Sequence, residues 1–402
     1  MMEDNVSDCA ESQEDFPLHL EESIKSIIKK EGFIKHQVTR NLLPTEGGSF
    51  LGRLYTVTVQ GTTREGDKQT DIFIKHILSC EKLKSTFDVH HAYETELYVY
   101  KELSKIFTDL QNDAGITVED RFKMVKSYDE SSLKAIILEN VSLKGYKTCS
   151  RTYVASLEDA EFSMKQLAKF HGLSFVLGER RPDYFSRNIK VNQGPFIFNE
   201  TFAHSARNIA EIAIKYIKEE SRQRMETFLK CFMTKWKRYA LDTTKTKCCL
   251  CHGDFRLNNI LMQHEDNRLK DVILIDYQLS CYGCPIDDLL HFIFTGTDQE
   301  FRRKHLTHLK DLYYASLGEF LGKFNLDCEK VYPRDEFEKD FKERLDLGLI
   351  YALYFLPFFL AAEGEIPDLA ETSIADMDFK VLEDLPLRMQ GIVDDFVSWG
   401  YL

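Results

Sequence analysis

The spacing of hydrophobic residues near the start of the chain predicts a helix and then a pair of strands. From 17 to 32, apolar residues recur at helical spacing, glutamates come first and lysines last, and Gly32 stands where a helix would end. From 55 to 59 apolar residues alternate with polar ones, and a second apolar run follows at 71–77 after a polar turn. We therefore expect a hairpin after the helix.

Three further segments complete the pattern of the first third of the chain. Residues from about 86 to 105 have a helical composition, and the short apolar runs 122–125 and 135–138 favour strands. This part of the chain therefore predicts a small sheet with one long helix.

The rest of the chain has the pattern of a mostly helical unit. Ser156, followed three residues later by Asp159, is typical of a helix N-terminus. The uncharged apolar stretch 347–362 is interrupted by Pro357 and is shorter than the roughly 18 to 20 residues that span a bilayer, so we expect a buried helix there. An island at 248–284 differs, because two short apolar runs predicted as strands flank polar loops.

Length and composition predict a globular, acidic protein of two lobes. The chain has 402 residues, 43% of them hydrophobic, and 65 acidic against 52 basic residues give a formal charge of −13. Such a chain has no global attraction for phosphate backbones or anionic lipid, and we find no local basic patch, so neither nucleic acid nor a membrane is an expected partner. We divide the chain into an acidic disordered tail at 1–15, a first lobe at 16–138 and a second lobe at 139–402.

The first residues and the cysteines point to a reducing compartment. Residues 1–15 carry six acidic residues and no basic one, unlike a secretory signal, and the chain has ten cysteines. We therefore expect a cytoplasmic protein without disulfides. Two Cys-x-x-Cys pairs, Cys248 with Cys251 and Cys281 with Cys284, look superficially like a zinc site, but the 29 residues between the pairs exceed the usual spacing. We interpret them as buried thiols.

The island at 248–284 contains an ordered set of polar residues that phosphoryl transfer uses. It includes CHGDFRLNNILM and, ten positions further on, VILIDYQLS. Asp254 is suited to orient an attacking hydroxyl and to take its proton. The carboxylate of Asp276 and the amide oxygen of Asn259 are hard oxygen ligands of the kind that Mg²⁺ prefers.

The same chemistry requires a positive group for the phosphates of ATP, and Lys75 is the candidate. It lies inside the apolar run 72–77, where a lone charge is costly unless it meets a ligand or an opposite charge. Glu96, in the helix that follows, is its expected partner. Glu94 is the alternative, since the two glutamates lie about 200° apart around a helix and only one of them can face Lys75.

Together these residues resemble the ecdysteroid kinase-like family, a branch of the choline and aminoglycoside kinase group with a protein-kinase-like fold. The resemblance extends from about Gly47 to the carboxy terminus and includes the motifs YETELYVY, LENVSLKGY, LAKFHG, HGD…NN, IDYQ and DDLLHFIF. It implies an α+β, bilobal fold, in which a small N-terminal antiparallel sheet with one long helix binds nucleotide and a large, mostly helical C-terminal lobe carries catalysis and substrate binding. The cofactors that it implies are ATP and Mg²⁺.

The resemblance also implies roles for individual residues. Asp254 would be the catalytic base. The other assigned residues would hold either the metal ion or the nucleotide: Asn259 and Asp276 the Mg²⁺, and Lys75, Glu96, Glu139 in the hinge 138–140, Gly47, Gly48 and Ser49 the ATP. His252 would brace the loop backbone. Of the neighbouring polar residues, we interpret Asn258 as stabilising the loop and His171 as a hydrogen-bonded core histidine.

Two departures from related patterns stand out. The protein-kinase DFG motif becomes Asp276-Tyr277-Gln278, where the family usually has Phe in the middle. The segment 47–52 is not the GxGxxG loop of protein kinases, and no Walker A sequence is present, which argues against the P-loop class.

The function that we expect is transfer of the γ-phosphate of ATP to a hydroxyl of a small molecule. The resemblance implies an ecdysteroid or another hydroxylated lipophilic metabolite or xenobiotic, while choline or an aminoglycoside stays open as acceptor. A catalytically silent pseudokinase is a further alternative, against which the complete residue set argues. A protein kinase is disfavoured, because the segment after Asp276 has no APE-like motif and soon enters a helix. Helices after about Gly145, including 196–204 and 351–359, are expected to form the acceptor pocket, and no protein partner is required.

Overall fold

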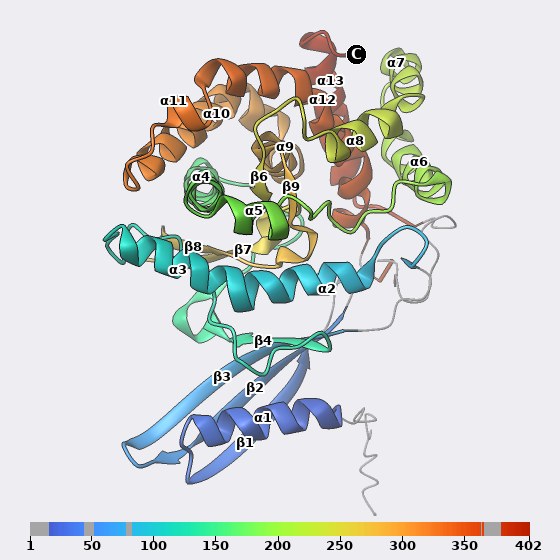
Figure 1. Ribbon diagram of the computed structural model, residues 1–402. Coiled ribbons are helices and arrows are strands. Elements are labelled where there is room, and N and C mark those ends of the chain that lie inside the picture. The colour runs from blue at the N-terminus through green and yellow to red at the C-terminus, as the bar shows by residue number, and fades with distance from the viewer. Residues whose placement is uncertain (1–15, 44–51, 78–82, 363, 366–378) are drawn as a thin grey trace, which may run out of the picture.

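The chain forms a sheet with one helix packed against it and a larger helical body above them (Figure 1). The computed structural model describes residues 16–43, 52–77, 83–362, 364–365 and 379–402. The acidic tail predicted at 1–15 and the candidate nucleotide residues Gly47, Gly48 and Ser49 lie outside the described residues.

The N-terminal sheet is antiparallel, with the strand order β1-β2-β3-β4. Its strands are β1 (Lys35–Leu43), β2 (Gly52–Thr63), β3 (Gly66–Ile77) and β4 (Ala135–Glu139). Helix α1 (Leu18–Lys30) packs on it, and Tyr128, from the segment before β4, joins their common core. The other buried residues of this core are Leu20, Ile24, Ile27, Ile28, Tyr55, Val57, Val59, Ile72, Ile74, Ala135 and Ile137. The predicted helix and hairpin are therefore present, and both strands of the hairpin are longer than predicted.

One long helical run crosses between this sheet and the helical body (Figure 1). Helix α2 (Val89–Tyr98) continues through a π-helical turn, Val99–Leu103, into α3 (Ser104–Asp113). Tyr93 of α2 and the buried residues of α3 belong to the larger core and not to the core of the sheet. The long helix predicted at 86–105 therefore exists and extends further, and it packs mainly with the second lobe.

The second lobe consists of helices around two small sheets. One sheet has the order β5-β7-β8, from β5 (Tyr146–Lys147), β7 (Ile260–Glu265) and β8 (Arg268–Leu274), and the other pairs β6 (Cys249–Cys251) with β9 (Cys281–Gly283). The helices of this lobe are α4 (Leu157–Arg180), α5 (Pro182–Asn188), α6 (Glu200–Ile214), α7 (Glu219–Leu229), α8 (Phe232–Leu241), α9 (Pro285–Gly296), α10 (Gln299–Gly322), α11 (Cys328–Val331), α12 (Arg334–Phe359) and α13 (Asp384–Ser398). This arrangement confirms the predicted α+β class, while the lobe boundary drawn between 138 and 139 stays a prediction.

The strand predicted at 122–125 is wrong, because this segment joins no sheet. Instead, the side chain of Gln111 forms hydrogen bonds with the backbone of this segment, at Phe122. Gln111 Oε1 accepts a hydrogen bond from the N–H of Phe122 (2.7 Å), and Gln111 Nε2 donates to the carbonyl of Phe122 (3.3 Å). Since a buried backbone group needs a partner of any kind, this side chain lets an apolar run lie in the core without a neighbouring strand.

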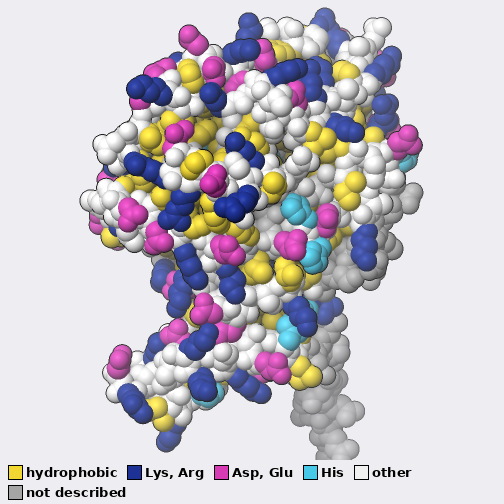
Figure 2. Space-filling view, in the orientation of Figure 1, with side chains coloured by type: hydrophobic (Ala, Val, Ile, Leu, Met, Phe, Trp, Pro, Cys, Tyr) yellow, Lys and Arg dark blue, Asp and Glu magenta, His cyan; other side chains and the backbone are white. Residues whose placement is uncertain are grey.

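Most of the apolar stretch 347–362 forms the end of α12, which closes at Phe359, with Pro357 inside the helix and most side chains buried, as predicted. Among the described residues, no helix is both long and apolar enough to cross a membrane. On the face that Figure 2 shows, basic and acidic side chains are interspersed and do not gather into one basic patch.

Candidate active site

A short loop after β6 carries Asp254, and its backbone is held from α9. Gly253 has a φ of +80°, and a Cβ there would lie 2.0 Å from the carbonyl oxygen of Leu279, so only glycine fits. The carboxylate of Asp288 accepts hydrogen bonds from the N–H groups of His252 (2.6 Å) and Gly253 (2.9 Å). The loop therefore has one conformation that α9 and the segment before β9 define together.

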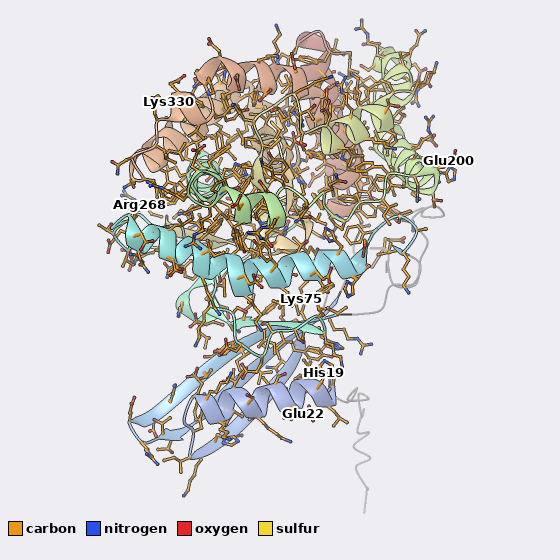
Figure 3. The ribbon with its side chains drawn as sticks, in the orientation of Figure 1. His19, Glu22, Lys75, Glu200, Arg268 and Lys330 are labelled. Carbon is orange, nitrogen blue, oxygen red and sulfur yellow. The ribbon has the colours of Figure 1, made fainter. Side chains whose placement is uncertain are left out.

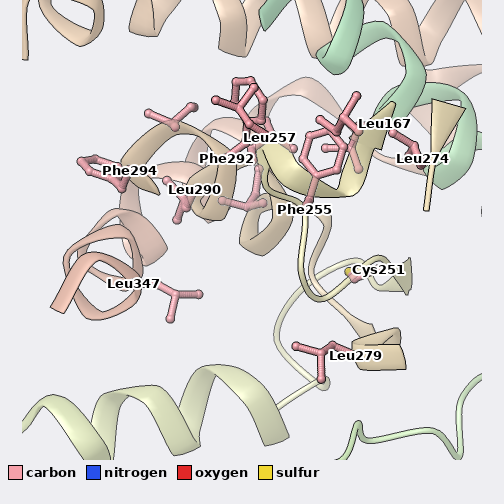
Figure 4. Close-up of a cluster of buried hydrophobic side chains, with 14 of the residues drawn as sticks. Leu167, Cys251, Phe255, Leu257, Leu274, Leu279, Leu290, Phe292, Phe294 and Leu347 are labelled. Carbon is pink, nitrogen blue, oxygen red and sulfur yellow. The ribbon is translucent and has the colours of Figure 1, made fainter. Parts of the chain in front are cut away.

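Apolar residues after Asp254 anchor the same loop in the core (Figure 4). Phe255 is fully buried, and its ring centroid lies 5.5 Å from that of Phe292 in α9. Leu257 is also buried, in the short 3₁₀ turn that leads to β7. Since these side chains follow Asp254 directly, the core fixes the backbone on which its carboxylate stands.

The carboxylate of Asp254 is buried and is paired on one side. Its Oδ2 atom accepts hydrogen bonds from Asn259 Nδ2 (2.7 Å) and Arg256 Nε (3.1 Å). Burial opposes ionisation of Asp254, but the charge of Arg256 and its hydrogen bond to the carboxylate act in the other direction, and the pKa of the carboxyl lies below its ordinary value. Asp254 is therefore an ionised carboxylate at neutral pH and can accept a proton.

Asp276 and Asn259 lie on two loops that a backbone hydrogen bond joins, from the N–H of Ile275 to the carbonyl of Asn259 (3.0 Å). Asp276 has a φ of 67°, in the left-handed region that non-glycine residues seldom adopt. Asn259 donates a hydrogen bond from Nδ2 to Asp254, and its amide oxygen is the atom that can bind a cation. This oxygen and the Asp276 carboxylate are the hard donors that suit Mg²⁺, so the residues present fit that ion.

Lys75 reaches from β3 to the second lobe, and Figure 3 shows it between the sheet and α2. Its Nζ donates to Glu96 Oε2 (2.8 Å), Asp276 Oδ1 (2.6 Å) and Gln278 Oε1 (2.9 Å). Burial opposes the charge of Lys75, yet the carboxylates of Asp276 and Glu96 raise the pKa of this lysine. Burial also raises the pKa of Glu96 to about 7, against the effect of Lys75. Glu94 is exposed and faces His90 instead.

Glu139 ends β4, in the segment predicted as the hinge. Its backbone N–H donates to the carbonyl of Lys126 (2.9 Å), and its side chain pairs with Lys144 (2.8 Å). The N–H of Asn140 donates to the carbonyl of Asp71 (2.9 Å). These two N–H groups are thus engaged within the chain, and the role of Glu139 toward a nucleotide stays a prediction.

Other polar residues of the site lie as the sequence led us to expect. Asn258 Nδ2 donates to the carbonyl of Cys149 (3.0 Å), which stabilises the loop. The ring of His252 pairs through Nε2 with the carbonyl of Ile275 (3.0 Å) and lies against the buried Tyr277, with ring centroids 4.9 Å apart. His171 is fully buried and hydrogen-bonded, as described below.

The cysteines of the island form a different grouping from the Cys-x-x-Cys pairs of the sequence. The ligand atoms of His171, Cys249 and Cys251 lie within 4.8 Å of one another. However, Nδ1 of His171 pairs with the hydroxyl of Tyr313 (2.7 Å) and its Nε2 with Asp288 (2.9 Å). Burial raises the pKa of both thiols, so the cluster has the properties of a hydrogen-bonded core and not of a metal site.

Four residues of the site were not assigned from the sequence: Arg256, Gln278, Asp288 and His291. Arg256 follows the base by two positions and stacks over the ring of Phe359 at 4.7 Å. Gln278 is the last residue of the motif IDYQ, and Asp288 and His291 lie in the motif DDLLHFIF. Both motifs belong to the family resemblance found in the sequence. The motifs located these residues, but only the fold shows what their side chains contact.

Comparisons with known proteins place these features in context. The sequence matches the ecdysteroid kinase-like family over residues 46–326. Acyl-CoA dehydrogenase family member 11 of Rattus norvegicus and of Mus musculus are each 34% identical over 59 residues, which is 15% of this chain. The match spans only 7% of the length of each of these relatives.

Solved structures with a similar course of the chain include two kinases. The ethanolamine kinase of Plasmodium vivax has 10% identity and a TM-score of 0.42, covering 90% of this chain and 83% of that one. The GDP complex of aminoglycoside 2′-phosphotransferase-IIIa has 13% identity and a TM-score of 0.38, covering 84% and 100%. The family model matches residues 46–326, which are most of this chain, and the chain therefore belongs to the ecdysteroid kinase-like family.

Proposed function

We propose that this protein is an ATP- and Mg²⁺-dependent phosphotransferase that transfers the γ-phosphate of ATP to a hydroxyl of a small molecule. One observation carries the proposal: the buried Lys75 contacts the carboxylates of Glu96 and Asp276. The loop that carries Asp276 is in turn hydrogen-bonded to Asn259, which is paired with Asp254. Membership of the ecdysteroid kinase-like family supports the same activity.

The chemistry assigns one task to each group. As the acceptor oxygen bonds to the γ-phosphorus and the bond from that phosphorus to the leaving ADP oxygen breaks, Asp254 takes the proton of the acceptor hydroxyl. Lys75, oriented by Glu96, binds phosphate oxygens. Asn259 and Asp276 would hold Mg²⁺, which supplies positive charge for the phosphates. The proposed nucleotide contacts outside this group are Glu139 in the hinge and Gly47, Gly48 and Ser49.

The charges around the base favour an uncharged acceptor over choline or an aminoglycoside. Arg256, only 5% exposed, places a cation next to Asp254, so the pair carries no net negative charge to attract an ammonium group. Aromatic side chains lie close by, among them Tyr351 and Phe355, which are half-buried in α12. These features support a hydroxylated lipophilic acceptor such as an ecdysteroid or a xenobiotic.

A catalytically silent pseudokinase is the alternative that has to be tested. A module that only binds nucleotide has no use for a base and a second metal ligand, so the presence of Asp254 beside Asn259 argues against it. We further propose that the enzyme works in the cytoplasm on a small molecule and needs no protein partner.

The proposal is tested by incubating the protein with Mg²⁺, ATP and an extract of hydroxylated metabolites that contains added ecdysteroids. Mass spectrometry then searches for compounds that gain a phosphate, with the Asp254→Asn variant in parallel. A gain seen only with the intact protein supports the proposal and identifies the acceptor. If ATP binds in the presence of Mg²⁺ but no compound gains a phosphate, the pseudokinase is favoured.

A further inference from the structure

Oδ1 of the proposed base Asp254 and the two ring nitrogens of His291 are buried and have no hydrogen-bond partner in the described part of the chain. Nδ1 of His252, on the loop that carries Asp254, is also buried and unpaired. Buried side-chain polar atoms are nearly always paired, because an unpaired one loses its hydrogen bond to water without a replacement. Three such atoms on two neighbouring side chains indicate a place that a bound polar group completes.

The spacing of these atoms fits one bridging oxygen. Nε2 of His291 lies 3.7 Å from Oδ1 of Asp254, which is too far for a direct hydrogen bond. An oxygen about 2.8 Å from each atom would bond to both. The other carboxylate oxygen of Asp254 is already occupied by Asn259 and Arg256, so Oδ1 is the oxygen left to meet a substrate.

The two side chains also have complementary hydrogen-bonding roles. Burial lowers the pKa of His291 to about 4, so its imidazole is neutral at pH 7. The carboxylate of Asp254 favours the tautomer with the proton on the nearer nitrogen, Nε2. Nε2 is then a donor and Oδ1 an acceptor, which is the pair that a hydroxyl group requires, because a hydroxyl both donates and accepts.

The ring of His291 is held in place by aromatic neighbours from α12. Its centroid lies 4.9 Å from that of Tyr351 and 4.7 Å from that of Phe355, with interplanar angles of 32° and 25°. His291 is 1% exposed, whereas Tyr351 and Phe355 are half-buried, so this aromatic layer extends from the base toward the surface. A fixed ring keeps its Nε2 atom aimed at one position.

We infer that His291 positions the acceptor hydroxyl, with Nε2–H donating to the hydroxyl oxygen while the hydroxyl hydrogen points to Oδ1 of Asp254. This inference rests on the proposed function and deepens it. It also accounts for transfer to a hydroxyl and not to a protonated amine, since a protonated amine has no lone pair with which to accept from Nε2. The second ring nitrogen, Nδ1, stays available as an acceptor for another polar group of the substrate.

The test uses the full chain and two probes, water and ecdysone. With water as acceptor the reaction is ATP hydrolysis, which needs no knowledge of the natural substrate. The variants are His291→Phe, which keeps the stacked ring and removes both nitrogens, and His291→Gln, which restores polar atoms. His308→Phe, at an exposed histidine of α10, is the matched control, and His291→Met replaces the Phe variant if that variant does not fold.

We expect His291→Phe to lower kcat for both probes by about 10- to 100-fold, the loss of one hydrogen bond to a reacting group, while the Kd for MgATP from calorimetry stays unchanged. His291→Gln should recover part of kcat, and His308→Phe should behave as the wild type. An unchanged kcat in His291→Phe, together with its loss in Asp254→Asn, overturns the inference and leaves the proposed function standing. If the intact protein transfers phosphate to neither probe nor any extract compound, both are overturned.

Discussion

The Nζ atom of Lys75 in the N-terminal sheet lies 2.6 Å from Oδ1 of Asp276, 201 positions further along the chain. The same ammonium group donates to Glu96, so one buried lysine connects β3, α2 and the loop after β8. If Asp276 holds Mg²⁺ as proposed, Lys75 and the metal ion share one carboxylate. Lys75 therefore joins the two lobes in the structure, and its role toward the nucleotide is part of the proposed function.

Replacing Lys75 separates these two contributions. We expect Lys75→Met to lower kcat/KM for ATP by about 10²- to 10³-fold, since a positive group is lost from the phosphates. It should also lower the free energy of unfolding, because two buried carboxylates lose their partner. Steady-state kinetics and urea unfolding measure the two effects.

A double variant serves as the control for stability. Lys75→Met with Glu96→Gln removes one of the unpaired charges, and we expect it to regain much of the lost stability without regaining activity. Equal activity of Lys75→Met and the wild type would show that the lysine has only a structural role.

Asp276 should govern how ATP binding depends on the metal ion. In Asp276→Asn one hard anionic ligand is lost, so we expect Mg²⁺ to increase the affinity for ATP much less than in the wild type. Calorimetric titration with ATP, in Mg²⁺ and in EDTA, gives this comparison for both proteins. Glu94→Gln, an exposed substitution on the same helix as Glu96, is the control. The assignment fails if Mg²⁺ strengthens binding equally in the variant and the wild type.

Asp254→Asn should affect the chemical step alone. Its carboxylate accepts a hydrogen bond from Nδ2 of Asn259, a proposed Mg²⁺ ligand, and the amide oxygen of an asparagine at 254 can accept the same bond, so binding of MgATP should persist. Loss of a general base lowers turnover by about 10²- to 10⁴-fold. Rapid mixing with radiolabelled ATP would measure this loss, and near-normal turnover would remove Asp254 from the role of base.

The pattern of the sequence predicted the site where local spacing is decisive. Lys75 stands out because a charge interrupts an apolar strand, and Glu96 follows from the helix that comes next. The capping of α4 by Ser156 and Asp159 is equally local, and both reciprocal hydrogen bonds of the capping box are present. The capping box involves two residues of one helix end. The Lys75–Glu96 pair follows from the choice of the one glutamate of the helix that can face the lysine.

Features that depend on the tertiary fold were not predictable in this way. The strands β1 and β7 carry polar residues at many positions and lack clear alternation, so they were missed. The apolar run 122–125 has the pattern of a strand, because nothing in its own residues indicates that the side chain of Gln111 pairs with the backbone of Phe122. His291 reads as one position of an apolar helix, and only its approach to Asp254 from 37 positions away gives it chemical meaning.

His291 should make stability depend on pH. Burial lowers its pKa from 6.5 to about 4, so between these values the unfolded chain binds a proton that the folded chain does not. The free energy of unfolding is therefore unaffected by this group above pH 6.5. It falls by up to roughly 3 kcal/mol as the pH drops from 6.5 to 4. The charges that act on His291, Asp254, Asp288, Arg256 and His252, are retained in His291→Phe.

The measurement is the free energy of unfolding from pH 4 to pH 8 for the wild type and for His291→Phe. We expect the wild type to lose more stability on acidification than the variant does, with the difference confined to this window. Parallel curves for the two proteins would show that His291 is protonated equally in the folded and unfolded chain.

Gly253 should be irreplaceable for a reason that goes beyond its backbone angle. Gly115 also has a positive φ, +66°, but nothing lies within 4 Å of a Cβ placed there, whereas at Gly253 such an atom would meet the carbonyl of Leu279. Gly115→Ala should therefore cost only the left-handed strain of about 1–2 kcal/mol. Gly253→Ala should cost more by about 1–3 kcal/mol, because the loop has to shift, and it should reduce turnover since Asp254 moves with the loop. Urea unfolding and ATP hydrolysis of both variants give the comparison, and equal losses in the two would mean that the contact with Leu279 does not constrain the loop.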